Sequence, residues 1–389
     1  MKIVKIETYV LTDYLEKSFY FSQWSYDHRK ICIVKITTDS GIVGWGEGYG
    51  PAEVIESGIK YLKPILMGRD AIQQEVLWFD MYRKSLDYAR RGVLVASISA
   101  IDIALWDIKG KVLNLPVSTL LGGAHRDFVM PYATGLYFSD EGSQIDNLTN
   151  EALTYVEQGF KAIKMKVGLS IAQDIQNVKA IRETIGPYIK LMVDANHAYS
   201  LREALELSRQ IEAYDISWFE EPISPEFYDQ YSELRSKTSI PIAGGECEYL
   251  RYGHHNLLKA NCVDILQIDI CSAGGLTEAK RIAALSSTYG LEIVPHTWGT
   301  GIAFYAALHF IANLEPVPGR LHPPHCYIEY DRTENSIRES LTNPSIEMKD
   351  GFIAVPNRPG LGIEINEDAL HRFSSKSNRV SASYVKATT

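Results

Sequence analysis

The feature that most constrains the fold is a repeated alternation of short apolar segments and longer helical segments, beginning near Tyr132. Segments such as LREALELSRQIEAY and LTEAKRIAALSSTYG have apolar residues at helical spacing. Between them lie eight segments typical of strands: VMPYAT, KAIKMK, KLMVDA, ISWFEE, PIAGGE, VDILQID, LEIVPH and CYIEY. Alternating strands and helices imply a parallel sheet, and seven or eight units over roughly 200 residues favour a closed barrel. No GxGxxG or Walker-type loop appears, which disfavours a nucleotide-binding open sheet.

The first third of the chain has a different, α+β character. KIVKIETYVL, KICIVKITT and GIVGWGE are typical of strands, and residues 76–90 and 94–111 have helical periodicity. The turn residues of LLGG at 120–123 end this part. After the eighth barrel strand, DGFIAVPNRPGLGIEIN resembles a short β-rich segment able to fold back on the N-terminal part.

Length and composition exclude several classes of protein. A chain of 389 residues is long enough for two domains. The net charge of −9 argues against a nucleic-acid binder but permits a local basic site for an anionic small molecule. Five cysteines without a CxxC pair suggest neither a zinc ribbon nor a disulfide framework. Because we find no signal-peptide pattern and no apolar run of about 18 residues, we expect a cytoplasmic enzyme or binding protein without membrane contact.

Ionisable residues end the barrel strands, where barrel active sites lie. In chain order they are Lys164 and Lys166, Asp194, Glu220 and Glu221, Glu246, Asp269, His296 and Glu329. Taken singly, an acid after a strand is most simply a helix N-cap, the second acid of an EE pair a solvated residue, and the pair at 254–255 a surface feature. Six successive strands ending in acids, amines and an imidazole favour one shared site instead.

The segment FKAIKMKVG at 160–168 contains the two lysines. Residues alternate between the faces of a strand, so Lys164 and Lys166 share one face. Alone, this pattern predicts a solvated strand edge, because burying two like charges is costly. Beside the acids of the neighbouring strands, it predicts two lysines in the barrel mouth, where repulsion by Lys164 favours a neutral Lys166.

Three carboxylates from adjacent strands, Asp194, Glu220 and Glu246, form a hard-oxygen set suited to Mg²⁺. Zinc would favour His and Cys, which are absent from this trio. His296 lies on the far flank, and Asp269 ends the preceding strand, where a carboxylate can orient an imidazole. A metal between two bases suits proton abstraction α to a carboxylate, because a divalent cation stabilises the enediolate.

The KxK pair, the Asp/Glu/Glu trio and the Asp–His pair together resemble the enolase superfamily, in its mandelate racemase subgroup. The resemblance covers essentially the whole chain. It implies an α/β protein with a modified (β/α)7β TIM-type barrel and an α+β capping domain formed by the N-terminal part and the C-terminal segment. We expect the capping domain over 1–125, the barrel over 126–355 and the returning segment over 356–389.

The same resemblance implies roles for individual residues. The bases and their partner are Lys166, His296 and Asp269; the Mg²⁺ ligands are Asp194, Glu220 and Glu246; the substrate contacts are Lys164, Glu329, Asn196 and His28. Asp269 replaces the lysine of muconate-lactonising enzymes and dipeptide epimerases, and Glu246 replaces the amide of glucarate dehydratases, so both branches are disfavoured.

Longer segments, including RGVLVASISAIDIALWDIKGK, WFEEPISPE and VPHTWGTGIAFYAAL, resemble the sugar-acid cycloisomerases and dehydratases of the subgroup. We therefore expect a Mg²⁺-dependent lyase or isomerase, acting on an acid sugar or aldarolactone by β-elimination to give a 3-deoxy-2-keto acid, in a homo-oligomer of two to eight copies. A two-base racemase or epimerase and a non-catalytic sugar-acid binding protein remain alternatives.

Substrate specificity is expected in the capping domain, in an aromatic loop over 14–30 and the turn at 49–51. His28 and Arg29 in that loop suit a polyhydroxylated anion. Packing of the loop against the barrel is an equal alternative.

Overall fold

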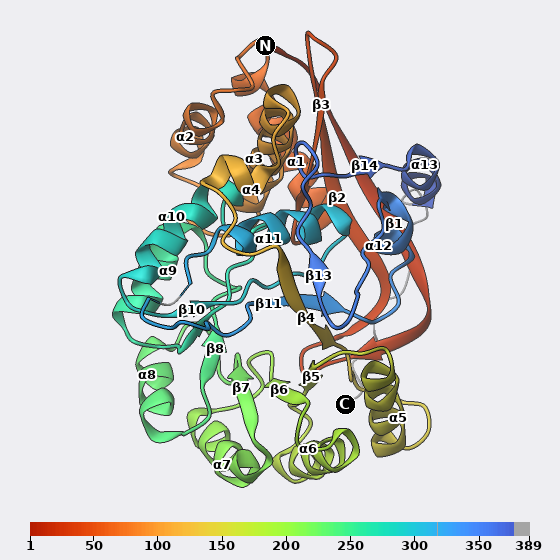
Figure 1. The fold of residues 1–389 in the computed structure, drawn as a ribbon, viewed down its shortest axis with the longest axis vertical. Helices are drawn as coiled ribbons and strands as arrows, with labels where there is room; N and C mark the ends of the chain where they lie inside the picture. The colour runs from red at the N-terminus through yellow and green to blue at the C-terminus, as the bar shows by residue number, and fades with distance from the viewer. Residues whose placement is uncertain (317, 377–389) are drawn as a thin grey trace.

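The computed structural model describes residues 1–316 and 318–376. Its N-terminal part is an antiparallel sheet of β1 (Ile3–Tyr20), β2 (Ser25–Thr38) and β3 (Val43–Gly48), covered by α1 (Ala52–Leu66), α2 (Gln74–Ser85) and α3 (Val93–Leu113) (Figure 1). The helices expected over 76–90 and 94–111 are α2 and α3, whereas α1 has no counterpart in the prediction. The short helix α4 (Val117–Leu121) leads to the barrel.

Residues 14–30 are not a loop, contrary to expectation. β1 and β2 continue as one long hairpin, in which Tyr14 pairs with His28 and Phe19 with Tyr26. Only residues 21–24 form the turn. The aromatic side chains that suggested a binding loop also favour strands, because they pack well on a pleated surface.

Eight parallel strands alternate with helices and form a curled sheet (Figure 1). They are β4 (Phe128–Thr134), β5 (Ala162–Lys166), β6 (Lys190–Asp194), β7 (Ile216–Glu220), β8 (Ile242–Gly244), β9 (Ile265–Leu266), β10 (Glu292–Ile293) and β11 (Tyr327–Asp331). The intervening helices are α5 (Gln144–Glu157), α6 (Ile171–Ile185), α7 (Leu201–Ile211), α8 (Tyr228–Lys237), α9 (Leu250–Lys259), α10 (Gly275–Ser287) and α11 (Gly301–Asn313). The order β10-β9-β8-β7-β6-β5-β4-β11 confirms the predicted (β/α)7β architecture.

One buried side chain from almost every barrel strand fills the barrel interior. Tyr132 packs edge-to-face against Trp218, and Ala162, Met192, Ala243, Ile265 and Val294 complete this layer. The interior is therefore a packed core, and the functional groups lie above it at the carboxyl ends of the strands. β9 and β10 are shorter than expected, and an isolated bridge beyond them joins Asp269 to His296.

The C-terminal segment contacts both the barrel and the N-terminal sheet. It contains α12 (Ser336–Leu341), β12 (Thr342–Asn343), β13 (Ile353–Ala354), β14 (Glu364–Ile365) and α13 (Glu367–Lys376). β13 pairs with β4, the Leu361 amide donates to Asp107 Oδ1 (2.9 Å), and Lys35 donates to Glu367 (3.1 Å). These contacts show the expected return of the C-terminal segment to the cap. Residues 377–389 of that segment lie outside the described residues, and the exact domain boundaries stay a prediction.

Buried polar contacts join the N-terminal part to barrel helices α10 and α11. Glu47 of β3 accepts hydrogen bonds from the Thr300 amide (3.0 Å) and the Ala303 amide (3.3 Å) at the start of α11. Asp102 of α3 accepts from the Thr277 amide (2.9 Å) and hydroxyl (2.6 Å) of α10. These contacts hold the cap over the barrel mouth. None of the helices in the described part of the chain is both long and apolar enough to span a membrane.

Candidate active site

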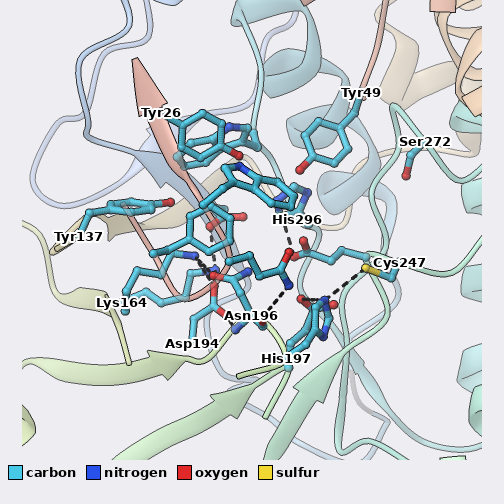
Figure 2. Close-up of a pocket in the computed structure, with 18 of the residues that line it drawn as sticks. Tyr26, Tyr49, Tyr137, Lys164, Asp194, Asn196, His197, Cys247, Ser272 and His296 are labelled. Atoms are coloured by element: carbon cyan, nitrogen blue, oxygen red, sulfur yellow. Dashed lines mark hydrogen bonds and ion pairs between the residues drawn. The ribbon is translucent and has the colours of Figure 1, made fainter. Parts of the chain in front are cut away.

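A cavity of about 150 Å³ lies between the carboxyl ends of the barrel strands and the aromatic side chains of the cap (Figure 2). Phe21, Trp24 and Tyr26 line it from the hairpin, and Tyr49 lines it from the turn after β3. The expected turn therefore reaches the site. The predicted site residues that line this cavity are Lys164, Lys166, Asp194, Asn196, Glu246, His296 and Glu329.

Lys164 is buried within a group of carboxylates at the end of β5. Its Nζ atom donates to Glu220 and lies 2.8 Å from Glu329 Oε1 and 3.6 Å from Asp194 Oδ2. Burial alone would lower the pKa of Lys164, but Glu220 and Glu329 raise it well above its usual value. Lys164 is therefore a permanent cation in this arrangement.

Lys166 points into the cavity from the same face of β5. Its Nζ atom donates to Asp194 Oδ2 (2.5 Å) and to Asn196 Oδ1 (2.8 Å), and it lies 5.0 Å from the centre of the Tyr137 ring. Burial would raise the pKa of Asp194, but Lys166 and Lys164 lower it. Each lysine is thus paired with carboxylates, so repulsion between the lysines is not the dominant interaction that we expected.

His296 follows β10 and lines the same cavity as Lys166, from a strand five steps away from β5 in the order of the sheet. Its Nδ1–H group donates to Asp269 Oδ2 (2.6 Å), and its Nε2 atom lies 3.6 Å from Glu246 Oε2. Burial lowers the pKa of His296, but Glu246, the Asp269 hydrogen bond and Glu329 outweigh burial and raise the pKa to about 10. His296 and Asp269 meet in the tertiary structure although their positions in the sequence are 27 apart.

Glu329 at β11 is held by three donors. Its Oε1 atom accepts from Thr134 (2.7 Å), its Oε2 atom accepts from the Thr297 amide (3.0 Å), and Lys164 pairs with it. Burial would raise the pKa of Glu329, but Lys164 and His296 lower it to about 2. This carboxylate therefore stays ionised and fixes the position of Lys164.

The three carboxylates expected to bind Mg²⁺ follow successive strands β6, β7 and β8. Burial and the nearby carboxylates of Asp194, Glu329 and Glu246 raise the pKa of Glu220 to about 7, although Lys164 lowers it. Such crowding favours a bound cation, and an all-oxygen donor set fits Mg²⁺. Asp194 and Glu220 converge on Lys164, whereas Glu246 faces His296.

A different set of ligands lies closer together. Among the described residues, His197, Glu221 and Cys247 form the only group of three His, Cys, Asp or Glu side chains whose ligand atoms lie within 4.8 Å of one another. The sequence patterns did not indicate this group. Glu221, for which a solvated position was the simplest interpretation of the residue taken alone, is buried, and its Oε2 atom lies 3.0 Å from His197 Nε2.

Two histidines lie where we did not expect them. His28 does not line the main cavity; it pairs with Asp27 (2.5 Å) and lines a neighbouring cavity, because it lies two residues along β2 from Tyr26. His254 is buried on the inner face of α9, where its Nδ1 atom lies 2.7 Å from the Leu250 carbonyl oxygen, and burial lowers its pKa to about 4.

The aromatic side chains that line the cavity form a wall that includes Phe21, Trp24, Tyr26, Tyr49, Tyr137 and Trp298. Sequence patterns predicted only the part of this wall that belongs to the segments 14–30 and 49–51. Arg29 is buried, pairs with Asp331 (3.1 Å) and lies 4.4 Å from the centre of the Trp298 ring. It supports the wall and does not line the main cavity. Tyr137 and Trp298 line the cavity and contact each other, with ring centres 5.8 Å apart.

Two family models match the chain. The Enolase C-terminal domain-like family matches residues 147–369, and the N-terminal domain of the mandelate racemase / muconate lactonizing enzyme family matches residues 5–122.

Named relatives cover almost the whole chain. D-galactarolactone cycloisomerase of Agrobacterium fabrum is 41% identical over 96% of this chain and 99% of its own length. Arabinonate dehydratase of Saccharolobus solfataricus is 38% identical over 90% of this chain and 91% of its own.

Solved structures show the same similarity. The 3,6-anhydro-D-galactonate cycloisomerase from Zobellia galactanivorans is 55% identical, with a TM-score of 0.88 over 96% of this chain and 99% of that chain. A racemase from Streptomyces coelicolor with bound magnesium is 27% identical, with a TM-score of 0.86 over 95% and 99%.

Proposed function

This chain belongs to the enolase superfamily and is an enzyme of its mandelate racemase subgroup, and from this premise we propose that it opens the ring of a cyclic sugar acid to give a 3-deoxy-2-keto acid. One observation carries the proposal. Lys166 on β5 and His296 after β10, which is paired with Asp269, line one cavity together with Asp194, Glu246 and Glu329, and five steps of the strand order separate β5 from β10. This arrangement suits removal of a proton from one side of a carbon and delivery of a proton on the other.

In the proposed reaction, the amine of Lys166 in its neutral form removes the proton from the carbon next to the substrate carboxylate, and a divalent cation held by Asp194 would favour that neutral form by compensating the carboxylate that pairs with Lys166. The electron pair then forms a carbon–carbon double bond and breaks the bond from the β-carbon to its oxygen. Protonated His296 gives its Nε2 proton to that oxygen, and the resulting enol becomes the 2-keto acid. If the oxygen belongs to the ring, the product is an isomer; if it belongs to a free hydroxyl group, water leaves.

The fixed charges have supporting roles. In this proposal Lys164, which pairs with Glu329, binds the substrate carboxylate, and Asn196 orients Lys166 by accepting its hydrogen bond at Oδ1. Asp194, Glu220 and Glu246 would hold Mg²⁺, whose charge would stabilise the enediolate. Asp269 keeps a proton on His296 Nδ1, so Nε2 is the atom that exchanges a proton with the substrate.

We propose 3,6-anhydro-D-galactonate as the first substrate to test and D-galactarolactone as the second. Two observations support this order: the higher identity to the anhydrogalactonate cycloisomerase, and the aromatic wall of the cavity. Aromatic faces suit the apolar C–H surface of a compact anhydro ring.

The test is incubation with Mg²⁺ and each of 3,6-anhydro-D-galactonate, D-galactarolactone and D-arabinonate in D₂O, followed by NMR. We expect the anhydro acid to give a 2-keto acid with deuterium at C3. Keto acid from D-arabinonate alone would favour the dehydration suggested by the arabinonate dehydratase relative. Recovered acid with α-deuterium and inverted configuration would identify a racemase or epimerase. Binding without any conversion across the panel would contradict catalysis.

A further inference from the structure

Strands β6, β7 and β8 each present a second metal-ligating side chain just beyond the proposed Mg²⁺ ligands. These side chains are His197, Glu221 and Cys247, and all three line the main cavity. Figure 2 shows His197 beside Cys247 at one edge of the site. Unlike the all-oxygen trio, this group offers nitrogen, oxygen and sulfur.

The spacing of the three ligand atoms matches a tetrahedral metal site. Cys247 Sγ lies 3.6 Å from His197 Nε2, which lies 3.0 Å from Glu221 Oε2. With Zn–S of about 2.3 Å and Zn–N and Zn–O of about 2.1 Å, tetrahedral angles place sulfur and nitrogen roughly 3.6 Å apart and nitrogen and oxygen roughly 3.4 Å apart. Small side-chain adjustments therefore suffice to surround a zinc-sized ion.

The orientation of His197 also suits a ligand. Its Nδ1 atom lies 3.3 Å from the backbone carbonyl oxygen of Ile223, so Nδ1–H donates there, and in the neutral imidazole the lone pair on Nε2 faces Glu221 and Cys247. Metal-ligating histidines usually donate their other ring N–H group to a carbonyl or carboxylate in this way.

Glu221 supplies an independent observation. Its Oε2 atom is buried and has no hydrogen-bond partner among the described residues, although His197 Nε2 lies 3.0 Å away. A carboxylate oxygen and an imidazole lone pair are both acceptors, and among the described residues the only donor facing that lone pair is the Cys247 thiol, so Glu221 Oε2 is left without a donor. A cation bound by Glu221, His197 and Cys247 would give that carboxylate oxygen a partner.

We propose that His197, Glu221 and Cys247 form a second cation site, selective for thiophilic divalent ions of the zinc class, and that its occupation inhibits the enzyme. Binding replaces the thiol proton of Cys247 with the metal and releases one proton. Mg²⁺ prefers oxygen ligands and does not compete well for a thiolate. Inhibition follows because the ion enters the cavity that Lys166 lines. The inhibitory role rests on the proposed function, whereas the binding of the ion does not.

The binding test is a Co²⁺ titration of the full-length protein in excess Mg²⁺, followed by the near-ultraviolet thiolate-to-cobalt charge-transfer band. We expect the band in the wild type, saturating at about one Co²⁺ per chain. Cys247→Ser should abolish it, while Cys326→Ser, which alters another incompletely buried cysteine away from the site, should retain it. His197→Asn should weaken Co²⁺ binding roughly tenfold or more. Absence of the band in the wild type, or its persistence in Cys247→Ser, overturns the site.

A second measurement needs no variant. Cys247 is exposed and can react with a thiol reagent. Zn²⁺ should slow its modification, located by peptide mass mapping, and unchanged modification at saturating Zn²⁺ overturns the site. For inhibition, the rate with Zn²⁺ is compared with the zinc-free rate of the same protein. Wild type and Cys326→Ser should lose activity and Cys247→Ser should not; zinc binding without inhibition would overturn only the inhibitory role.

Discussion

Lys166 and His296 have separable roles in the proposed reaction, because one removes a proton and the other supplies one. Lys166→Ala should abolish both exchange of the α-proton with D₂O and formation of keto acid, since the only other amine among the described residues that line the cavity, Lys164, is held by Glu220 and Glu329. General-base catalysis contributes a factor of about 10² to 10⁴, so turnover should fall by at least that factor. NMR of the substrate in D₂O measures both.

His296→Asn should behave differently, because it removes the acid and leaves the base. Elimination should fall by about 10²- to 10⁴-fold while α-proton exchange continues. Lys161→Ala is a matched control, since Lys161 belongs to the same segment but is exposed outside the cavity. Full turnover in Lys166→Ala would refute the assignment of the base. Loss of exchange in His296→Asn would reverse the two roles.

The three carboxylates that are proposed to hold Mg²⁺ should also make the stability of the protein depend on the metal. The carboxylates of Asp194 and Glu246 raise the pKa of Glu220 even with Lys164 beside it, so Mg²⁺ bound by the three carboxylates should stabilise the folded protein. At a concentration 100 times Kd the expected gain is about 2.7 kcal/mol. Thermal unfolding with Mg²⁺ and with a chelator should show this gain in the wild type and a much smaller one in Glu246→Gln. Equal gains in both proteins would exclude Glu246 from the ligands.

At the scale of elements, two glycines of β3 let this strand pack directly against the backbone of α3. A Cβ atom at Gly46 would lie 1.9 Å from the Ala100 carbonyl oxygen, and one at Gly44 would lie 2.1 Å from that of Ala104. Glycine is therefore required where the strand crosses the helix. This contact also fixes Glu47, which binds the start of α11.

Gly46→Ala should force β3 and α3 apart and lower the free energy of unfolding by about 2 kcal/mol or more. Gly244→Ala is the control, because a Cβ atom there would meet Val263 at an ordinary 3.7 Å. Denaturant unfolding measures both variants. An effect of Gly46→Ala no larger than that of the control would contradict the close packing.

At the scale of the whole molecule, buried carboxylates join the cap to the barrel. Burial raises the pKa of Asp102 to about 7, although its hydrogen bonds from Thr277 lower it. The folded protein therefore binds a proton at Asp102 that the unfolded chain has released above about pH 4. The contribution of Asp102 to the free energy of unfolding has its full value below about pH 4. It decreases as the pH rises toward 7, by up to about 1.4 kcal/mol per pH unit.

Asp102→Asn should remove this contribution. The free energy of unfolding of the wild type should fall relative to that of Asp102→Asn from pH 4 to pH 7, and the difference between the two proteins should stay constant above pH 7. Denaturant unfolding over that range measures the difference. Asp87→Asn, at an exposed position, is the control. A constant difference across the range would show that Asp102 does not change its protonation on folding in this window.

Local patterns in the sequence determined much of this protein. The strand and helix periods predicted a closed barrel of β/α units, because each period depends on neighbours along one segment, and the family resemblance implied its (β/α)7β form. The charged residues at the strand ends predicted one shared site, because parallel strands deliver their carboxyl ends to one rim. Lys164, Lys166, Asp194, Glu246 and His296 accordingly line one cavity.

Only the tertiary structure decided which distant groups meet. It extended the expected aromatic loop into a hairpin, moved His28 away from the main cavity, and paired the lysines with acids. It also brought His197, Glu221 and Cys247 together, although each appears ordinary beside its own neighbours in sequence. The physical reason is that ion pairing, burial and ligand geometry depend on distances across elements, whereas periodicity records only which face of an element a residue occupies.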